Sequence, residues 1–121
     1  MKPLNVLVVE DDALIGLLLG ELLVEMGHGV CAIEATKSGA VAAALLHQPD
    51  MMIVDAQLGD ESGVAAMESI LLTRLVPHVF VSGNILNVLT LCPDAVGLQK
   101  PYTESALVSA MERALATAPS A

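Results

Sequence analysis

Apolar and polar positions alternate along this chain in blocks that predict strands and helices in turn. The first block, Val6-Leu7-Val8-Val9, is apolar throughout and ends at acidic residues, which is typical of a parallel strand buried on both faces. It predicts a strand over about residues 4–9. From Asp12 onward the apolar residues recur at helical spacing, which predicts a helix that ends near Gly27. The residues expected on one face of this helix are Leu14, Leu17, Leu18, Leu22 and Met26.

The same alternation continues through the rest of the chain. The predicted strands are 29–34, 51–54, 78–81 and 96–98, and the predicted helices are 36–46, 62–74 and 103–116. Strands that alternate with helices predict an α/β fold whose parallel sheet is covered on both faces by right-handed crossovers. Between the last two strands, residues 85–92 are apolar nearly all round and Pro93 follows, so a short or irregular helix is expected there.

Length and charge narrow the picture further. A chain of 121 residues that is 55% hydrophobic is long enough for one compact core, so we expect one domain over 1–121. Residues of about 4–117 should be ordered, and 116–121 should fray. Fourteen acidic residues stand against five Lys and Arg, a net charge of −9. A polyanion would be repelled, so direct nucleic-acid binding is not expected.

The cysteines and the apolar runs bear on the cell compartment. Cys31 and Cys92 stand alone, without a CxxC pair, which favours reduced thiols in a cytoplasmic protein. The N-terminal residues leave no room for a signal peptide before Glu10. No apolar run reaches the roughly 20 residues that a membrane-spanning helix needs, so membrane insertion is not expected.

Polar residues follow four of the five predicted strands. In a parallel α/β sheet, ligands bind beyond the carboxyl ends of the strands. These residues are Glu10, Asp11 and Asp12 after the first strand, Asp55 after the third, Ser82 after the fourth and Lys100 after the fifth. Clustered carboxylates repel one another unless a cation neutralises them, and Mg²⁺ prefers such hard oxygen ligands. The pattern therefore predicts a Mg²⁺ site suited to phosphoryl chemistry.

Within that site three residues are candidates for chemical roles. Asp55 can act as a nucleophile, and Lys100 can hold a fixed positive charge against the developing charge of a phosphoryl group. Ser82 can donate its hydroxyl to a phosphoryl oxygen.

Four fragments in this order and spacing resemble response-regulator receiver domains of two-component signalling. They are VLVVEDD at 6–12, VDAQL at 54–58 with Gly63 following, VSG at 81–83 and QKPY at 99–102. The resemblance covers essentially the whole chain. It implies a flavodoxin-like, doubly wound sheet of five parallel strands in the order 2-1-3-4-5.

The resemblance also implies a ligand set. Asp55 resembles the phospho-acceptor of the family and a metal ligand. Glu10 and Asp11 resemble the acidic pair, with Asp11 as the direct ligand and Glu10 acting through a water. Gln57 would give only its backbone carbonyl to Mg²⁺. Asp12 could be a third ligand, but it also stands where a helix N-cap belongs, and we favour the cap.

Further roles are implied around the fourth and fifth strands. Ser82 resembles the switch hydroxyl of the family, with Gly83 beside it. Lys100 resembles the lysine that is characteristic of receivers. In that family the peptide bond between this lysine and the following proline, here Pro101, is typically cis and would aim the lysine inward. His28, His47 and His78 have no carboxylate or thiolate pattern around them and are interpreted as ordinary loop or strand-edge residues.

The sequence departs from the family pattern at one switch position. Most receivers carry an aromatic residue three positions before the lysine, where this chain has Gly97. Residues 77–84 instead partly resemble an atypical subfamily of stand-alone alphaproteobacterial receivers with a Pro-Phe-x-Phe-Ala-Thr-Gly-Tyr motif. In that subfamily the fourth helix is short or mobile. We hypothesise that phosphorylation orders residues 84–95.

These observations favour a single-domain response regulator rather than an enzyme. It would take its phosphoryl group from a histidine kinase or phosphotransfer protein and would then bind a downstream protein target or serve as a phosphate shuttle or sink. A degenerate receiver that acts as a phosphorylation-independent interaction module is the alternative. A related phosphatase is disfavoured, because Gln57 stands where an acid/base residue would be needed. The expected working surface is the last helix with the fifth strand and the mobile loop at residues 84–95, and Leu107, Val108 and Met111 could be core or interface.

Overall fold

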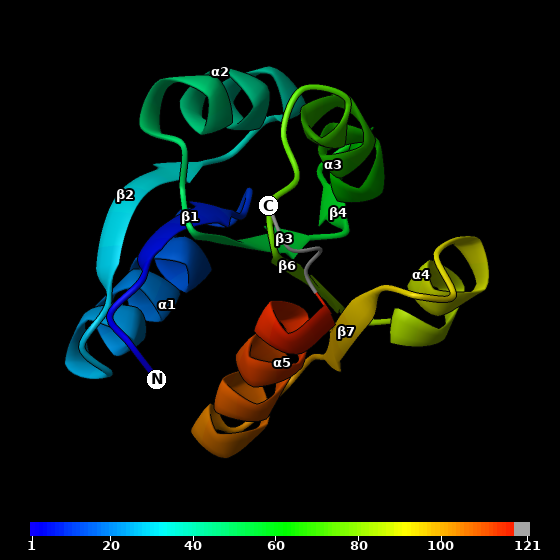
Figure 1. Cartoon of the computed structure of the whole chain (residues 1–121). Coiled ribbons are helices and arrows are strands. Elements are labelled where there is room, and N and C mark those ends of the chain that lie inside the picture. The colour runs from blue at the N-terminus through cyan, green and yellow to red at the C-terminus, as the bar shows by residue number, and fades with distance from the viewer. Residues whose placement is uncertain (118–121) are drawn as a thin grey trace.

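The computed structural model describes residues 1–117 as a parallel sheet of five strands with helices on both faces (Figure 1). The strands of this sheet are β1 Asn5–Val9, β2 Gly29–Glu34, β3 Met51–Asp55, β6 His78–Ser82 and β7 Val96–Gln99. Their spatial order is β2-β1-β3-β6-β7, the doubly wound order that the resemblance implied. The helices are α1 Ala13–Glu25, α2 Lys37–His47, α3 Gly63–Leu71, α4 Ile85–Leu91 and α5 Glu104–Thr117.

The core has two apolar layers, one on each face of the sheet. β1 and β3 lie at its centre, and residues 6–9 and 51–54 are almost completely buried, as apolar runs without polar alternation predict. α2, α3 and α4 cover one face, and α1 and α5 cover the other. Leu107 and Met111 of α5 are buried in the second layer and Val108 is half-buried, so the first two belong to the core.

Most predicted element boundaries agree with the structure, and the differences have local causes. α3 ends at Leu71, earlier than the predicted residue 74, because Thr73 and Arg74 both donate their amides to the Ile70 carbonyl in a turn. The Thr73 hydroxyl donates to the same carbonyl. A two-stranded hairpin, β4 Gln57–Leu58 with β5 Glu61–Ser62, was not predicted.

The chain ends in regular structure as far as it is described. Ala116 and Thr117 belong to α5, so the fraying predicted from residue 116 is wrong for these two. The rest of that prediction falls on 118–121, which lie outside the described residues. Within residues 1–117, no helix is both long and apolar enough to cross a bilayer, and Cys31 and Cys92 form no disulfide.

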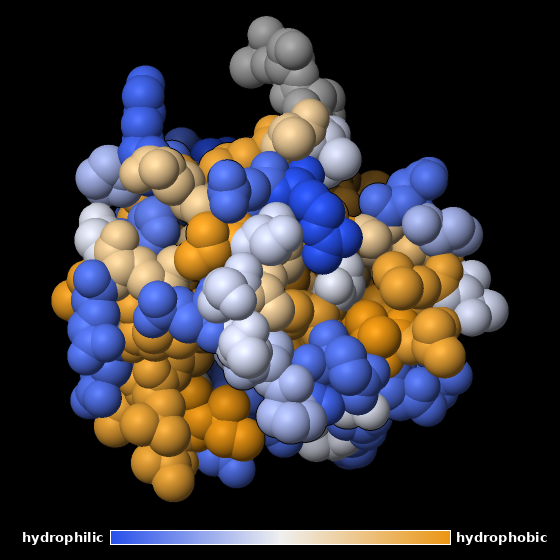
Figure 2. All heavy atoms as spheres, turned by 90° about the horizontal axis from the view of Figure 1, so that it is seen from below, coloured by the Kyte–Doolittle hydropathy of each residue, from blue (hydrophilic) through white to orange (hydrophobic). Residues whose placement is uncertain are grey.

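α1 packs on the sheet through a different face from the one that the apolar spacing suggested. Its buried residues are Gly16, Leu19, Gly20 and Leu23. Leu14, Leu17 and Leu18 are more than half exposed. The reason is close packing on β2: a Cβ added to Gly16 or Gly20 would lie 3.0 or 3.2 Å from side-chain atoms of Ile33. The two glycines bring α1 against the sheet and leave Leu14, Leu17 and Leu18 facing solvent, where an apolar area lies on the left of Figure 2.

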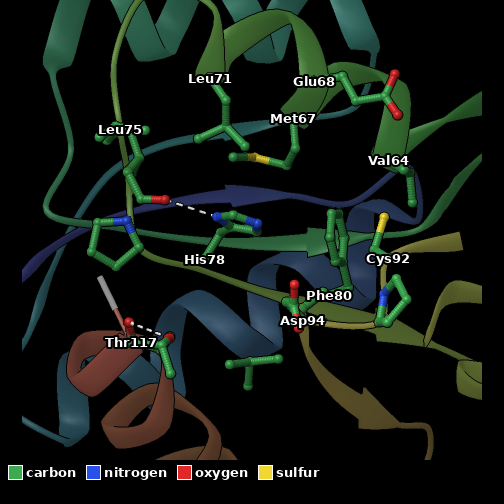
Figure 3. A pocket seen from close by; sticks show the side chains of 16 residues that line it. Val64, Met67, Glu68, Leu71, Leu75, His78, Phe80, Cys92, Asp94 and Thr117 are labelled. Carbon is green, nitrogen blue, oxygen red and sulfur yellow. Dashed lines mark hydrogen bonds between the residues drawn. The ribbon is translucent and has the colours of Figure 1, made fainter. Parts of the chain in front are cut away.

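α4 is a helix of seven residues at the β7 edge of the sheet (Figure 1). This agrees with the short helix expected there from the sequence. It packs on β6 and β7. Between α3 and the segment that joins α4 to β7 lies a cavity of about 570 Å³. Figure 3 shows Val64, Met67 and Leu71 of α3 on one side of this cavity and Cys92 on the other, with Phe80 of the sheet between them.

Candidate functional site

The carboxyl ends of β1, β3, β6 and β7 meet at one rim of the sheet and form a hollow of about 620 Å³. Register explains the meeting: Val9 pairs with Val54, so the next residues, Glu10 and Asp55, emerge side by side. Ser82 pairs with Gln99, which places Lys100 beyond the end of β6. The sequence-predicted residues that line the hollow are Glu10, Asp11, Asp12, Asp55, Gln57, Ser82, Gly83 and Lys100.

Lys100 joins the two buried carboxylates of the hollow. Its Nζ donates to Asp55 Oδ2 at 2.6 Å and to Glu10 Oε1 at 2.9 Å. Asp55 is 8% exposed and Glu10 is 5% exposed. Burying two carboxylates side by side is unfavourable without a cation, and Lys100 supplies one positive charge for two negative charges. The cluster therefore keeps an excess of negative charge.

Burial and the neighbouring charges shift the pKa values of Glu10 and Lys100. Burial raises the pKa of Glu10 to about 7, the hydrogen bond from Lys100 opposes the rise and the neighbouring Asp55 adds to it. Burial by itself would lower the pKa of Lys100. Its hydrogen bonds to Asp55 and Glu10 outweigh burial, so the pKa of the ammonium is raised and the lysine remains positively charged.

Three carboxylates converge on a position suited to a metal ion. Glu10, Asp11 and Asp55 can each offer an oxygen, and these atoms lie within 4.8 Å of one another. Asp11 is exposed, and its Oδ2 accepts from the Gly59 amide at 2.9 Å. A donor set of carboxylate oxygens open to solvent on one side fits Mg²⁺, which keeps several waters and accepts phosphate oxygens. The residues present therefore fit the expected metal.

The loop after β3 positions the Asp55 side chain. Asp55 Oδ1 accepts from the Gln57 amide at 2.9 Å, while the Gln57 side chain donates to the Gly59 carbonyl and so turns away toward the hairpin. Gly63 allows this loop to fold back, because a Cβ there would collide with the Asp55 carbonyl oxygen. Steric packing therefore explains why the sequence motif has a glycine at position 63.

The remaining predicted residues occupy the two edges of the hollow. Asp12 caps α1, accepting from the Leu14 and Ile15 amides at 3.0 and 3.1 Å, so the preferred capping interpretation is confirmed. Ser82 Oγ accepts from the Asn84 amide at 2.9 Å. Pro101 is exposed and follows Lys100 through a cis peptide bond.

Sequence reasoning gave no role to two residues that shape the site. Gly59 binds Asp11 through its amide in the unpredicted hairpin. Gln99 lies directly before Lys100, and its side chain binds Gly83 and Ile85. Its place beside the lysine was the available signal, but its contacts depend on where α4 begins.

Comparison with known proteins agrees with this geometry. A family described as "Response regulator receiver domain" matches residues 6–112. The chain is 32% identical over 117 residues to "Transcriptional regulatory protein PdtaR" of Mycobacterium tuberculosis H37Rv, a match that covers 93% of this chain and 57% of that protein. The chain therefore spans little more than half the length of this curated relative.

Solved structures give the same result. The solution structure of the receiver domain of the PhyR response regulator from Erythrobacter litoralis superposes with a TM-score of 0.87 at 31% identity, covering 98% of this chain and 95% of that one. PhyR from Bartonella quintana, described as an anti-anti-sigma factor in complex with the anti-sigma factor NepR, matches with a TM-score of 0.63 at 30% identity. That match covers 65% of this chain and 33% of the other.

Proposed function

Because this chain belongs to the response-regulator receiver domain family, we propose that it accepts a phosphoryl group on Asp55 in a Mg²⁺-dependent reaction. Proteins with this domain act in two-component signalling and are regulators rather than classical enzymes. The donor would be a histidine kinase or a phosphotransfer protein. The observation that carries the proposal is the 2.6 Å bond from Lys100 Nζ to the buried Asp55 carboxylate, within a cluster that retains excess negative charge.

The transfer would be an in-line displacement. An Asp55 carboxylate oxygen attacks the phosphorus of a phosphohistidine, a P–O bond forms as the P–N bond breaks, and the electron pair stays on the imidazole nitrogen. The product is an acyl phosphate on Asp55. Lys100 exchanges part of its contact with Asp55 for a phosphoryl oxygen, and Ser82 donates its hydroxyl to another.

Glu10, Asp11 and Asp55, with the Gln57 backbone carbonyl, would hold the Mg²⁺. When bound, the ion neutralises the carboxylates and the incoming phosphoryl oxygens, so that two groups of like charge can approach. Asp11 would be a direct ligand because it is exposed, whereas Glu10 is engaged by Lys100 and would act through a water.

The phosphoryl donor would approach over α1. Ile15 of this helix lines the hollow, and Leu14 and Leu18 nearby are exposed. An exposed apolar surface that adjoins a reactive site favours contact with another protein. This arrangement explains why Leu14 and Leu18 face outward rather than into the core.

The output is proposed to be binding to a downstream protein in the cytoplasm, or phosphate shuttling. The PhyR of Bartonella quintana, which resembles this chain, forms a complex with the anti-sigma factor NepR, and this supports a protein target. The net charge of −9 opposes direct contact with nucleic acid. Retention of Asp11, Asp55, Ser82 and Lys100 together argues against the alternative of a phosphorylation-independent interaction module.

Intact mass after incubation with acetyl phosphate tests the proposal. The wild type should gain one phosphoryl group with Mg²⁺ and none with EDTA, and Asp55→Asn should gain none. Asp60→Asn is the matched control, because it removes an exposed carboxylate from the same loop and should leave the gain intact. A wild type that gains nothing under any condition would favour the interaction module instead.

A further inference from the structure

The side chain of Gln99 connects the end of β7 to the beginning of α4. Its Nε2 donates to the Gly83 carbonyl at 2.6 Å and to the Lys100 carbonyl at 3.0 Å, and its Oε1 accepts from the Ile85 amide at 3.0 Å. One side chain thus holds the strand end that carries Lys100, the loop after Ser82 and the first residue of α4.

Gln99 accepts a hydrogen bond from the first amide of α4, which no local side chain caps. Asn84 occupies the N-cap position of α4, but its side chain makes no capping hydrogen bond among the described residues. The first amides of a helix lack intrahelical partners and need acceptors. Gln99, 14 residues further along the chain, supplies one from a neighbouring strand.

A notch in β7 receives the same end of α4. Gly97 lies where most receivers carry an aromatic side chain, and a Cβ added to it would lie 2.6 Å from both Cγ1 and Cδ1 of Ile85. Ile85 therefore occupies the space that a larger residue at position 97 would take. The first turn of α4 is fixed by this contact and by the Gln99 hydrogen bonds.

The segment that directly follows α4 borders a cavity. The cavity of about 570 Å³ lies between the segment after α4 and α3, and apolar side chains line most of it (Figure 3). α4 is short and Leu86 and Leu91 on it are highly exposed, so few contacts oppose a shift of the helix.

Resting on the phosphoryl acceptance proposed above, we infer that Gln99 is the positioning residue that couples the phosphoryl site to α4. Ser82 Oγ now accepts from the Asn84 amide. When the hydroxyl turns to a phosphoryl oxygen on Asp55, that bond is lost and residues 83–84 rearrange. Gln99 holds the Gly83 carbonyl on one side and the Ile85 amide on the other, so it transmits the rearrangement to α4. The coupling replaces the inward turn of an aromatic residue at position 97.

Amide hydrogen exchange of residues 84–92 tests this inference, with beryllofluoride and Mg²⁺ as the phosphoryl probe and intact mass after acetyl phosphate measured in parallel. The wild type should show changed exchange in α4 on adding the probe. In Gln99→Ala, exchange without the probe should be faster by roughly five-fold, the effect of losing about one net hydrogen bond. The response to the probe should disappear, while Asp55 still gains one phosphoryl group.

Gln99→Glu separates coupling from mere support of the helix. Its carboxylate still accepts from the Ile85 amide but cannot donate to the Gly83 carbonyl. Basal protection of α4 should therefore be retained while the response to the probe is lost. Asn87→Ala, an exposed change within α4 itself, is the control and should keep the response.

The outcomes separate the two proposals. If the wild type gains a phosphoryl group and both Gln99 variants respond as it does, the coupling role is overturned and phosphoryl acceptance stands. An α4 that shows no response in the phosphorylated wild type also overturns the coupling. A wild type that gains no phosphoryl group overturns both.

Discussion

Two neighbouring regions of the molecule are built in opposite ways: the acidic rim, formed by Glu10, Asp55 and Lys100, and the α4 corner, formed by α4 with Gly97 and Gln99. Gln99 lies next to Lys100 in the chain and contacts α4 through its side chain. Glu10 follows β1 and Asp55 ends the neighbouring strand β3; both are almost fully buried and share one lysine. α4 has seven residues, packs at the edge of the sheet, is followed by a segment that borders a cavity, and depends on contacts with Gln99 and Gly97. The phosphoryl chemistry proposed for Asp55 would need atoms held in place, whereas the readout proposed for α4 would need an element that a small change can move.

The largest effect is expected from removing the lysine of the acidic rim. In Lys100→Met the rate of phosphoryl gain from acetyl phosphate should fall by about 100-fold or more, because a fixed positive charge no longer stabilises the developing phosphoryl charge. Mg²⁺ should bind more tightly, since the carboxylates lose a competing cation. Single-turnover kinetics and Mg²⁺ titration measure the two effects. An unchanged rate would show that Lys100 is only a counter-ion.

A pair of glycine variants compares the steric tolerance of the two regions. Gly63→Ala should cost about 3 kcal/mol of unfolding free energy, because its Cβ would collide with the Asp55 carbonyl, which cannot rotate away. Gly83→Ala should cost less than about 0.5 kcal/mol, since its Cβ would meet no atom within 4 Å among the described residues. Urea denaturation checks both, and equal costs would contradict the contrast.

A third change sharpens the comparison by disturbing α4 alone. Gly97→Ala should displace Ile85 and cost about 1 kcal/mol of unfolding free energy. Exchange of α4 amides should become faster, while phosphoryl gain on Asp55 stays near the wild-type rate. Gly29→Ala, where the Cβ would make ordinary contacts, is the control. A large loss of phosphoryl gain in Gly97→Ala would show that the rim and the corner are not separable.

The smallest expected effect tests a titrating group remote from both regions. His28 is buried and accepts from the Leu4 amide through Nδ1, and burial lowers its pKa below 6.5. The unfolded chain binds the proton more readily, so stability from His28 is present above pH 6.5 and is lost as the pH falls below that value. Between pH 7.5 and 5.5, His28→Asn should lose less unfolding free energy than the wild type. Identical losses in denaturant titrations would contradict this.

The strands and the rim could be predicted from sequence because each depends on local or topological rules. Val6-Leu7-Val8-Val9 has one stable solution, a strand buried on both faces, and parallel strands bring their carboxyl ends together. Glu10, Asp55 and Lys100 therefore converge whatever the details of the helices. The motif residues also preserved enough of the family pattern to indicate their order in the sheet.

Side-chain facing and long-range capping could not be predicted in the same way. α1 is apolar around most of its circumference, so periodicity did not decide its buried face; the small surface of Gly16 and Gly20 against Ile33 did. The hairpin at residues 57–62 depends on a turn with Gly59 at φ 63°, packed beside Asp11.

The sequence by itself determined the strand order, the acidic rim and the short fourth helix, because buried runs, motif spacing and Pro93 act locally or through fixed topology. Only the tertiary structure decided which face of α1 is exposed, that Ile85 fills the notch at Gly97 and that Gln99 caps α4. These features arise from contacts between elements, whose energies depend on the distance and angle at which helices meet the sheet and leave little trace in the order of residues.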